Sequence, residues 1–170
     1  GHHSITGASN PNDFISMIFD ACMKLKCAPD ADKWAFEMSP VDFLVKSIVQ
    51  FASEPSHFGQ VFNVVQNDPA PSRTVFDMLL EMKLISEYIS VDEWKVRLHK
   101  KAEKECDYLL NFLSQSLDDV AMYLIYESIY DCSRFEETLA KYCIKRPPTE
   151  TDYFKKFLNA TLWRKTYNFL

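Results

Sequence analysis

Two aspartates lie where helices are predicted to begin. A carboxylate at such a position could take part in the chemistry of a functional site. Asp42 follows Ser39-Pro40-Val41, and Asp13 follows Asn10-Pro11-Asn12. Free backbone amides and the helix dipole stabilise a negative charge there. Either carboxylate could therefore serve a functional site, but a structural cap is the favoured interpretation of both.

Cysteine and histidine side chains could supply a nucleophile or metal ligands. Cys22 and Cys27 form neither a Cys-x-x-Cys pair nor a zinc pattern. His57 and His99 are far apart in the sequence, with no acidic or cysteine partner at ligand spacing. We therefore predict no metal site and no catalytic residue in this chain. A small enzyme that uses a Cys–His pair is the least favoured of three hypotheses.

The sequence lacks the short motifs of nucleotide-binding and acyl-transfer enzymes. It contains no Gly-rich phosphate loop, no Tyr-x-x-x-Lys pair and no Gly-x-Ser-x-Gly segment. A basic run could instead attract an acidic partner, such as a carrier protein or its phosphate, although such runs are usually only a solvated face. Its members are Lys95, Arg97, Lys100, Lys101 and Lys104.

The elements that would position these residues follow from periodicity and breakers. From residue 10 to 100 the pattern predicts helix, strand, helix, strand, helix, strand, helix, and three helices follow. In the helix opened by Ser39-Pro40, the predicted inner face is Leu44, Val45, Ile48, Val49 and Ala52. The predicted strands are Lys33–Met38, Gln60–Val65 and Leu84–Ser90. The last three helices are Asp107–Tyr130, Ser133–Ile144 and Thr149–Tyr167.

The composition predicts a single domain with an aromatic core, and together with the pattern of helices and strands it favours a helix-rich α+β fold. The 170 residues are 47% hydrophobic and 14% aromatic, enough for a sizeable core, and three glycines disfavour an all-β fold. A net charge of -5 disfavours nucleic acids and anionic membranes as partners. Five irregularly spaced cysteines suit reduced thiols and predict a cytoplasmic protein. The opening Gly-His-His is interpreted as a tag remnant or cleavage site without functional weight.

Several stretches, in this order and spacing, resemble the C-terminal part of thioester reductase domains of the extended short-chain dehydrogenase type. They are TGASNPNDF, APD, MSPVDFLVKSIVQFA, GQVFNVVQNDPAP and an E-W that starts a helix near residue 93. Ser133–Leu170 is similar to that family's closing segment. Such domains end some nonribosomal peptide and polyketide synthetases and occur in carboxylic acid and aminoadipate reductases.

The resemblance implies the substrate-binding C-terminal part of a two-lobed NADPH-dependent reductase. An upstream Rossmann lobe, absent from this chain, would hold NADPH and the catalytic residues, so no cofactor is expected here and the isolated chain should be inactive. The complete enzyme would release a carrier-bound acyl or peptidyl thioester as aldehyde or alcohol. Its partners would be that lobe and a carrier protein with its phosphopantetheine arm, with no nucleic acid and no membrane.

The same resemblance implies where substrate would lie. The loop Ser4–Asn10 and the segment Met38–Asp42 correspond to parts near the family's substrate cleft. We expect Met38, Pro40 and Val41 to face the substrate, with Asp42 as the cap that fixes the loop. The chain divides into a loop at 1–9, a mixed α/β part at 10–105 and a helical part at 106–170. The alternative to a reductase lobe is an autonomous helical protein-interaction module.

Overall fold

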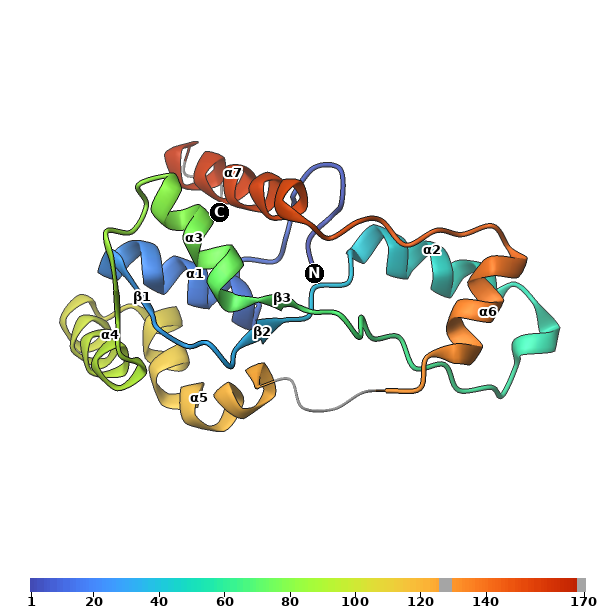
Figure 1. The fold of residues 1–170 in the computed structure, drawn as a ribbon, viewed down its shortest axis with the longest axis horizontal. Helices are drawn as coiled ribbons and strands as arrows, with labels where there is room; N and C mark the ends of the chain where they lie inside the picture. The colour runs from blue at the N-terminus through green and yellow to red at the C-terminus, as the bar shows by residue number, and fades with distance from the viewer. Residues whose placement is uncertain (126–129, 168–170) are drawn as a thin grey trace. The chain divides into compact units, whose positions relative to one another are not determined.

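The computed structural model describes residues 1–125 and 130–167 and confirms a helix-rich α+β fold (Figure 1). Within those ranges seven α-helices accompany four short strands. The helices are α1 (Phe14–Leu25), α2 (Val41–Ala52), α3 (Ser72–Glu81), α4 (Val91–Glu105), α5 (Tyr108–Leu124), α6 (Ser133–Lys141) and α7 (Thr151–Tyr167), with a 3-10 helix η1 (Pro55–His57). The strands are β1 (Cys27–Pro29), β2 (Ala35–Phe36), β3 (Ala70–Pro71) and β4 (Glu87–Ile89).

The chain forms two compact units, each assembled from segments that are distant in sequence. Unit 1 comprises Gly1–Ser9, Glu37–Pro69 and Glu127–Leu170, and unit 2 comprises Asn10–Phe36 and Ala70–Tyr126. Unit 1 therefore contains α2, α6 and α7, whereas unit 2 contains the remaining α-helices and all four strands. This partition runs across the predicted ranges 1–9, 10–105 and 106–170, since both units use early and late parts of the chain.

Unit 2 is built around α1, and the predicted capping role of Asp13 is confirmed. The helix begins at Phe14, and its cap is Asp13, whose carboxylate accepts a hydrogen bond from the Ser16 amide at 2.7 Å. Asn10 accepts a hydrogen bond from the Asn12 amide within the preceding turn. The buried stripe of α1 includes Ile18 and Cys22, as its spacing predicts.

The strands of unit 2 are shorter than predicted and form two separate pairs. β1 runs parallel to β4, and β2 runs antiparallel to β3. The predicted strand Lys33–Met38 is reduced to Ala35–Phe36, because its partner segment is only two residues long. Cys27–Pro29, which is not among the predicted strands, is a buried strand paired with β4.

Two helices in the second half of the chain, α4 and α5, begin at side-chain caps. The Ser90 hydroxyl accepts a hydrogen bond from the Glu93 amide at the start of α4. Asp107 caps α5 through the amides of Leu109 and Leu110. The start of α6 has no side-chain cap, and the Ser133 hydroxyl donates to the Asp131 carboxylate. The part of the predicted helix Asp107–Tyr130 at 126–129 lies outside the described residues.

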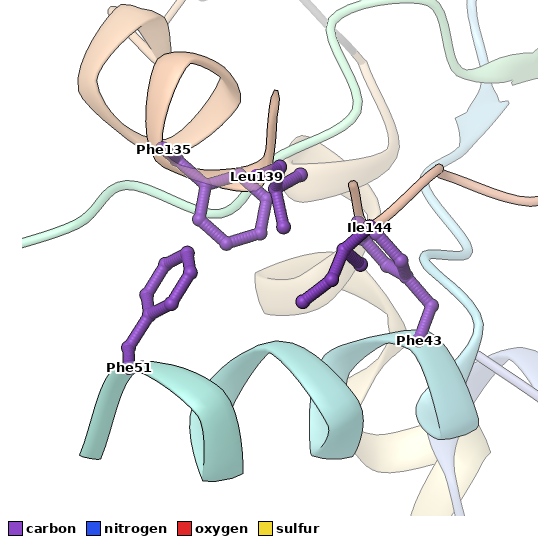
Figure 2. Close-up of a cluster of buried hydrophobic side chains, with 5 residues drawn as sticks. All are labelled: Phe43, Phe51, Phe135, Leu139 and Ile144. Atoms are coloured by element: carbon purple, nitrogen blue, oxygen red, sulfur yellow. The ribbon is translucent and has the colours of Figure 1, made fainter. Parts of the chain in front are cut away.

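The core of unit 1 joins α2 to α6 through aromatic rings (Figure 2). Phe43 and Phe51 of α2 pack against Phe135 of α6 at ring-centroid distances of 6.0 and 5.6 Å. Leu139 and Ile144 complete the buried cluster. The face that α2 turns inward is therefore Phe43, Ser47 and Phe51. The predicted inner face was wrong, because Val45, Ile48 and Val49 are exposed and aromatic packing with α6 decides the helix's orientation.

The predicted strand Gln60–Val65 does not form. These residues belong to none of the β-ladders in the described ranges. They run past the ends of α2 and α6, where Phe62 and Val64 pack partly against the aromatic cluster. A β-strand needs a neighbouring strand for its backbone hydrogen bonds, and the described residues of unit 1 contain none.

No helix in the described ranges is long and apolar enough to cross a membrane.

Candidate functional site

Two of the predicted site segments meet in unit 1, at the N-terminus of α2. The Asp42 carboxylate accepts hydrogen bonds from the Ser4 amide at 2.7 Å and from the Ser4 hydroxyl at 2.6 Å. Burial acts to raise the pKa of the Asp42 carboxyl, but the two bonds from Ser4 and its own amide hold that pKa below its usual value. Asp42 is thus a charged group that secures the loop 1–9 to α2.

The loop 1–9 is also anchored by His2, although the opening Gly-His-His predicts only a tag remnant or cleavage site. The His2 ring is fully buried and stacks on Tyr153 of α7 at 3.5 Å and on Phe157 at 4.9 Å between ring centroids. Its Nε2 lies 2.8 Å from the Tyr153 carbonyl oxygen, which fixes Nε2 as the protonated nitrogen. Burial lowers the pKa of His2 to about 4, although the bond to Tyr153 opposes the shift. His2 is therefore a neutral core residue at neutral pH.

Gly7 allows the same loop to lie directly on α7. Its φ angle is +71°, and a Cβ atom there would come within 2.2 Å of the Lys156 carbonyl oxygen. Glycine adopts this conformation without strain and leaves the space free. The TG pair that contributes to the family resemblance is thus needed for close packing between the loop and the helix.

Tyr153 links the loop to the segment before α2. Its hydroxyl lies 2.9 Å from the Met38 carbonyl oxygen and 3.1 Å from that of His2. Met38 and Pro40 are buried, whereas Val41 is 41% exposed. Among the predicted substrate-facing residues, Val41 is consequently the one whose side chain is accessible to a ligand in unit 1.

Ser39 has a different role from the helix cap that its position predicts. The N-cap of α2 is Pro40, and Ser39 directs its hydroxyl to the Glu37 carboxylate at 2.5 Å. Arg146 donates to the Ser39 oxygen at 3.1 Å and to Glu136 of α6 at 2.9 Å. This polar chain connects the start of α2 to α6 and supports the segment on which Val41 lies.

An apolar cavity of about 460 Å³ lies between α2 and the residues that follow it in unit 1. Its polar groups are few, and His57 is one of them, with Nε2 2.9 Å from the Tyr142 hydroxyl. The volume is within the range of small-molecule pockets. The cavity is lined by Leu44, Ser47, Ile48, Phe51, Ala52, His57, Phe58, Gln60, Phe62, Val64 and Phe135.

The arrangement around Asp42 suits binding and positioning better than nucleophilic catalysis. The Ser4 hydroxyl donates to a carboxylate whose low pKa makes it a weak base. The His3 Nδ1 is 4.0 Å from Asp42 and accepts from the Ile5 amide, so it does not take the Ser4 proton. Among the described residues, no group of three or more His, Cys, Asp or Glu could hold a metal ion.

The described residues do not fit a nicotinamide dinucleotide. Such a cofactor needs glycines in a turn between a strand and a helix N-terminus, where amides face the phosphates. Gly1 and Gly7 are in the loop 1–9, and Gly59 follows the 3-10 helix η1. No step of the chemistry is therefore assigned to a cofactor held by this chain.

The predicted basic run lies on α4 in unit 2 and is partly neutralised. Lys95 pairs with Asp118, and Lys101 pairs with Glu105. The Arg97 guanidinium binds both Glu93 and Glu87. These pairs reduce the local positive charge that would attract an acidic partner.

The sequence did not indicate four residues whose side-chain contacts fix the loop 1–9 and the segment Met38–Asp42. They are His2, Glu37, Arg146 and Tyr153. Tyr153 is 151 positions from His2, and Arg146 is 107 positions from Ser39. Local spacing carries no signal for such pairs. Within the last helix, aromatic residues recur at three and four positions, a spacing that is typical of a packing surface.

Two curated proteins illustrate the relatives found for this sequence, although no family model matches it. The non-canonical nonribosomal peptide synthetase FrzA of a Cladobotryum species is 29% identical over 170 residues, covering 92% of this chain and 16% of that protein. The glycine betaine reductase ATRR of Emericella nidulans is 35% identical over 92 residues, covering 54% of this chain and 7% of that protein. The chain thus spans less than a fifth of the length of these relatives.

Solved structures share the fold. The terminal R domain of the myxalamid PKS-NRPS biosynthetic pathway superimposes with a TM-score of 0.81 at 20% identity, covering 97% of this chain and 42% of that one. A thiolation-reductase di-domain of an archaeal non-ribosomal peptide synthetase gives a TM-score of 0.69 at 18% identity, covering 98% and 34%. The predicted resemblance to thioester reductase domains of synthetases is therefore confirmed, and the fold is that of part of a terminal R domain.

Proposed function

We propose that this chain is the substrate-binding part of an NADPH-dependent thioester reductase that acts on a carrier-bound acyl or peptidyl group. The observation that carries the proposal is the superposition on a terminal R domain over 97% of the chain. The fold likeness favours this proposal over an autonomous helical interaction module, since it extends over both units.

The reaction follows from the chemistry of a thioester. A hydride adds to the thioester carbonyl carbon, the carbon–sulfur bond breaks, and the thiolate leaves with a proton, so that an aldehyde and a free carrier thiol result. A second hydride and proton would convert the aldehyde to an alcohol. The hydride donor and the residues that polarise the carbonyl would lie in a nucleotide-binding lobe outside this chain. Within the described residues nothing fits the dinucleotide.

The proposed contribution of this chain is to shape the space that the acyl group enters. Val41 would face the substrate from the exposed start of α2, and buried Met38 and Pro40 would set its position from behind. Asp42 would act indirectly, because its bonds to Ser4 hold the loop 1–9 against the helix. These are positioning roles, and none of the four residues would move a proton.

A carrier protein with a phosphopantetheine arm would deliver the substrate. The archaeal protein with a similar fold is a thiolation-reductase di-domain, which supports a carrier as the neighbour of the complete enzyme. Because this chain has a net charge of -5, long-range electrostatic attraction to an acidic carrier is not favoured. Recognition would then depend on local contacts and on the tethered arm.

The test uses a polypeptide that joins this chain to a nucleotide-binding reductase lobe and a carrier loaded with an acyl thioester. We expect NADPH oxidation with release of aldehyde or alcohol, and no oxidation by the chain alone. Enlarging the exposed side chain with Val41→Trp should raise KM or change acyl preference with little effect on folding. Val96→Trp, at an exposed valine of α4, is the matched control. Release of free acid by hydrolysis, without NADPH oxidation, would exclude the proposal.

A further inference from the structure

The side chain of Arg146 is fixed from several directions in unit 1, although Arg146 lies in the irregular segment between α6 and α7. Its Nη1 donates to the Ser39 hydroxyl oxygen at 3.1 Å, and its Nη2 donates to the Glu136 carboxylate at 2.9 Å. The guanidinium also lies over the rings of Phe43 and Phe135, at 4.9 and 5.9 Å from their centroids. The side chain is only 20% exposed. Two hydrogen bonds and two rings therefore define the orientation of this cation.

The Ser39 hydroxyl connects Arg146 to a carboxylate on the same segment of chain. It accepts from Arg146 and donates to Glu37 at 2.5 Å, and Ser39 itself is buried. The Glu37 carboxylate accepts two further bonds, from the backbone amides of Ser39 and Gln66, each at 3.2 Å. A hydroxyl between a cation and a carboxylate makes two charge-assisted bonds, and each polarises the other. Arg146 thus helps to fix the position of Ser39.

A second contact fastens the segment of Arg146 to the neighbourhood of Glu37. The Gln66 side-chain amide donates to the Thr149 hydroxyl at 2.6 Å. Between Arg146 and Thr149 lie Pro147 and Pro148, and a proline disfavours helical backbone at the residue before it. The segment is therefore attached on both sides of a stiff Pro-Pro pair, which limits how far Arg146 can move away from Ser39.

These contacts bear on Val41, which lies two residues after Ser39. The intervening Pro40 is buried and has its φ angle at -61°, so little freedom remains between Ser39 and Val41. On the other side of Val41, Asp42 is bound by both Ser4 hydrogen bonds. Val41 is consequently a 41% exposed apolar side chain on a segment that is fixed at both ends. An apolar contact held in this way loses little conformational freedom when a ligand binds.

We propose that Arg146 is a positioning residue for the acyl group: acting through Ser39, it holds Val41 where that side chain contacts the substrate, and so sets the affinity for the acyl chain. The inference rests on the proposed function, which supplies the acyl group. Arginine is suited to this role because its two bonds use separate nitrogens and its planar group stacks on rings, which the single ammonium of lysine cannot reproduce. Arg146 moves no proton in this role.

Hydrogen exchange in the isolated chain tests the positioning itself. Arg146→Met keeps an apolar side chain over the two rings but removes both hydrogen bonds. We expect the amides of Ser39 and Val41, which are bonded to the Glu37 carboxylate and the His2 carbonyl, to exchange about tenfold faster in this variant. Arg146→Lys, which retains the charge, should show most of the same acceleration and guards against a folding defect caused by the loss of a cation.

Arg73→Met on α3 of unit 2 is the matched control. Arg73 also stacks on an aromatic ring, that of Tyr88 at 3.9 Å, and pairs with a carboxylate, that of Asp30 at 2.9 Å. It touches none of the residues at 37–42. Its substitution should leave the exchange of Ser39 and Val41 unchanged, although it removes the same kinds of interaction.

The kinetic test uses the polypeptide that also contains the nucleotide-binding lobe. Arg146→Met should raise KM for the carrier-bound acyl thioester about three- to tenfold while kcat changes by less than about twofold. A purely structural defect would instead lower the amount of active enzyme, which reduces the measured kcat and leaves KM unchanged. Combined with Val41→Ala, Arg146→Met should raise KM no further than Val41→Ala alone, because both act on the same contact.

Three results would overturn the inference. They are unchanged exchange at Ser39 and Val41, an unchanged KM, and effects of Arg146→Met and Val41→Ala on KM that simply multiply. Absence of NADPH oxidation by the unsubstituted longer polypeptide would contradict the proposed function instead. In that case titration with a carrier whose acyl chain is attached by an unreactive thioether still decides: weaker binding by Arg146→Met supports the positioning role, and equal binding removes it.

Discussion

Ser4 and Asp42, 38 positions apart, are joined by two hydrogen bonds of 2.7 and 2.6 Å that engage both oxygens of the carboxylate. One bond comes from the Ser4 backbone amide and the other from its hydroxyl. The pair fixes the first residues of the chain to the start of α2 and gives the segment Met38–Asp42 a defined position. Because the acceptor is charged, these bonds are stronger than those between neutral groups.

Removing the Asp42 carboxylate should release the loop 1–9. Asp42→Ala is expected to lower the free energy of unfolding by about 1–3 kcal/mol, the usual cost of losing hydrogen bonds to a half-buried charge. Amide exchange at Ser4 should accelerate as well. Asp92→Ala is the matched control, because Asp92 is also the second residue of its helix but is exposed and has no bond from a loop. Equal losses of stability from both substitutions would assign the Asp42 effect to the helix dipole.

Stability should depend on pH through His2. The pKa of His2 is about 4 in the folded chain against 6.5 for an ordinary histidine, so the unfolded chain binds more protons between these values. The stabilisation is therefore fully present above pH 6.5 and is lost as pH falls toward 4, by about 3 kcal/mol in total.

Denaturant unfolding between pH 4 and 7 would measure this slope. His2→Phe keeps an aromatic ring on Tyr153 and Phe157 but cannot titrate, and its slope over that interval should be clearly smaller. An unchanged slope would show that other groups produce the acid sensitivity. The N-terminal amino group, Asp42 and Lys156 also act on His2 electrostatically, and Asp42→Ala in the same series isolates the contribution of Asp42.

The aromatic cluster of unit 1 should be the most sensitive to truncation. Phe135 is 1% exposed and contacts the rings of both Phe43 and Phe51. Phe135→Ala should cost about 3–5 kcal/mol, the range for a buried phenylalanine. Phe112→Ala on α5 is the control, since its side chain is half exposed and should cost about 1 kcal/mol or less. A loss below about 1 kcal/mol at Phe135 would contradict the packing of α6 on α2.

Thiol modification should divide the five cysteines into two classes. Cys106 and Cys143 are exposed, whereas Cys22, Cys27 and Cys132 are buried. Burial raises the pKa of the Cys22 thiol well above its ordinary value, which further suppresses its reactivity. Mass spectrometry after iodoacetamide treatment of the folded chain should show two additions, and five after unfolding. Rapid modification of Cys22 in the folded chain would contradict its burial and revive the Cys–His hypothesis.

The fold class and most helices could be predicted because their signals are local. Asp107 and Ser90 are caps that act within one turn, and the stripe of α1 repeats at helical spacing. The inner face of α2 could not be predicted, because valine and isoleucine on one side compete with phenylalanine on the other. Which side turns inward depends on α6, almost a hundred residues away in the chain.

The site was predictable only in part, for the same reason. Local capping signals and the family resemblance selected Met38, Pro40, Val41 and Asp42. The structure adds Ser4, which joins Asp42 to the loop 1–9. The burial of His2 and its bond to Tyr153 depend on α7, and no spacing within the first ten residues indicates them.

The most direct test of a thioester reductase is to follow the hydride. A polypeptide that joins this chain to the nucleotide-binding lobe would be given NADPH deuterated at the transferred position and a carrier-bound acyl thioester. We predict an aldehyde with deuterium on its carbonyl carbon, or an alcohol with deuterium on the corresponding carbon, and no product from the chain alone. Release of the unlabelled acid, or deuterated product from the isolated chain, would contradict the account.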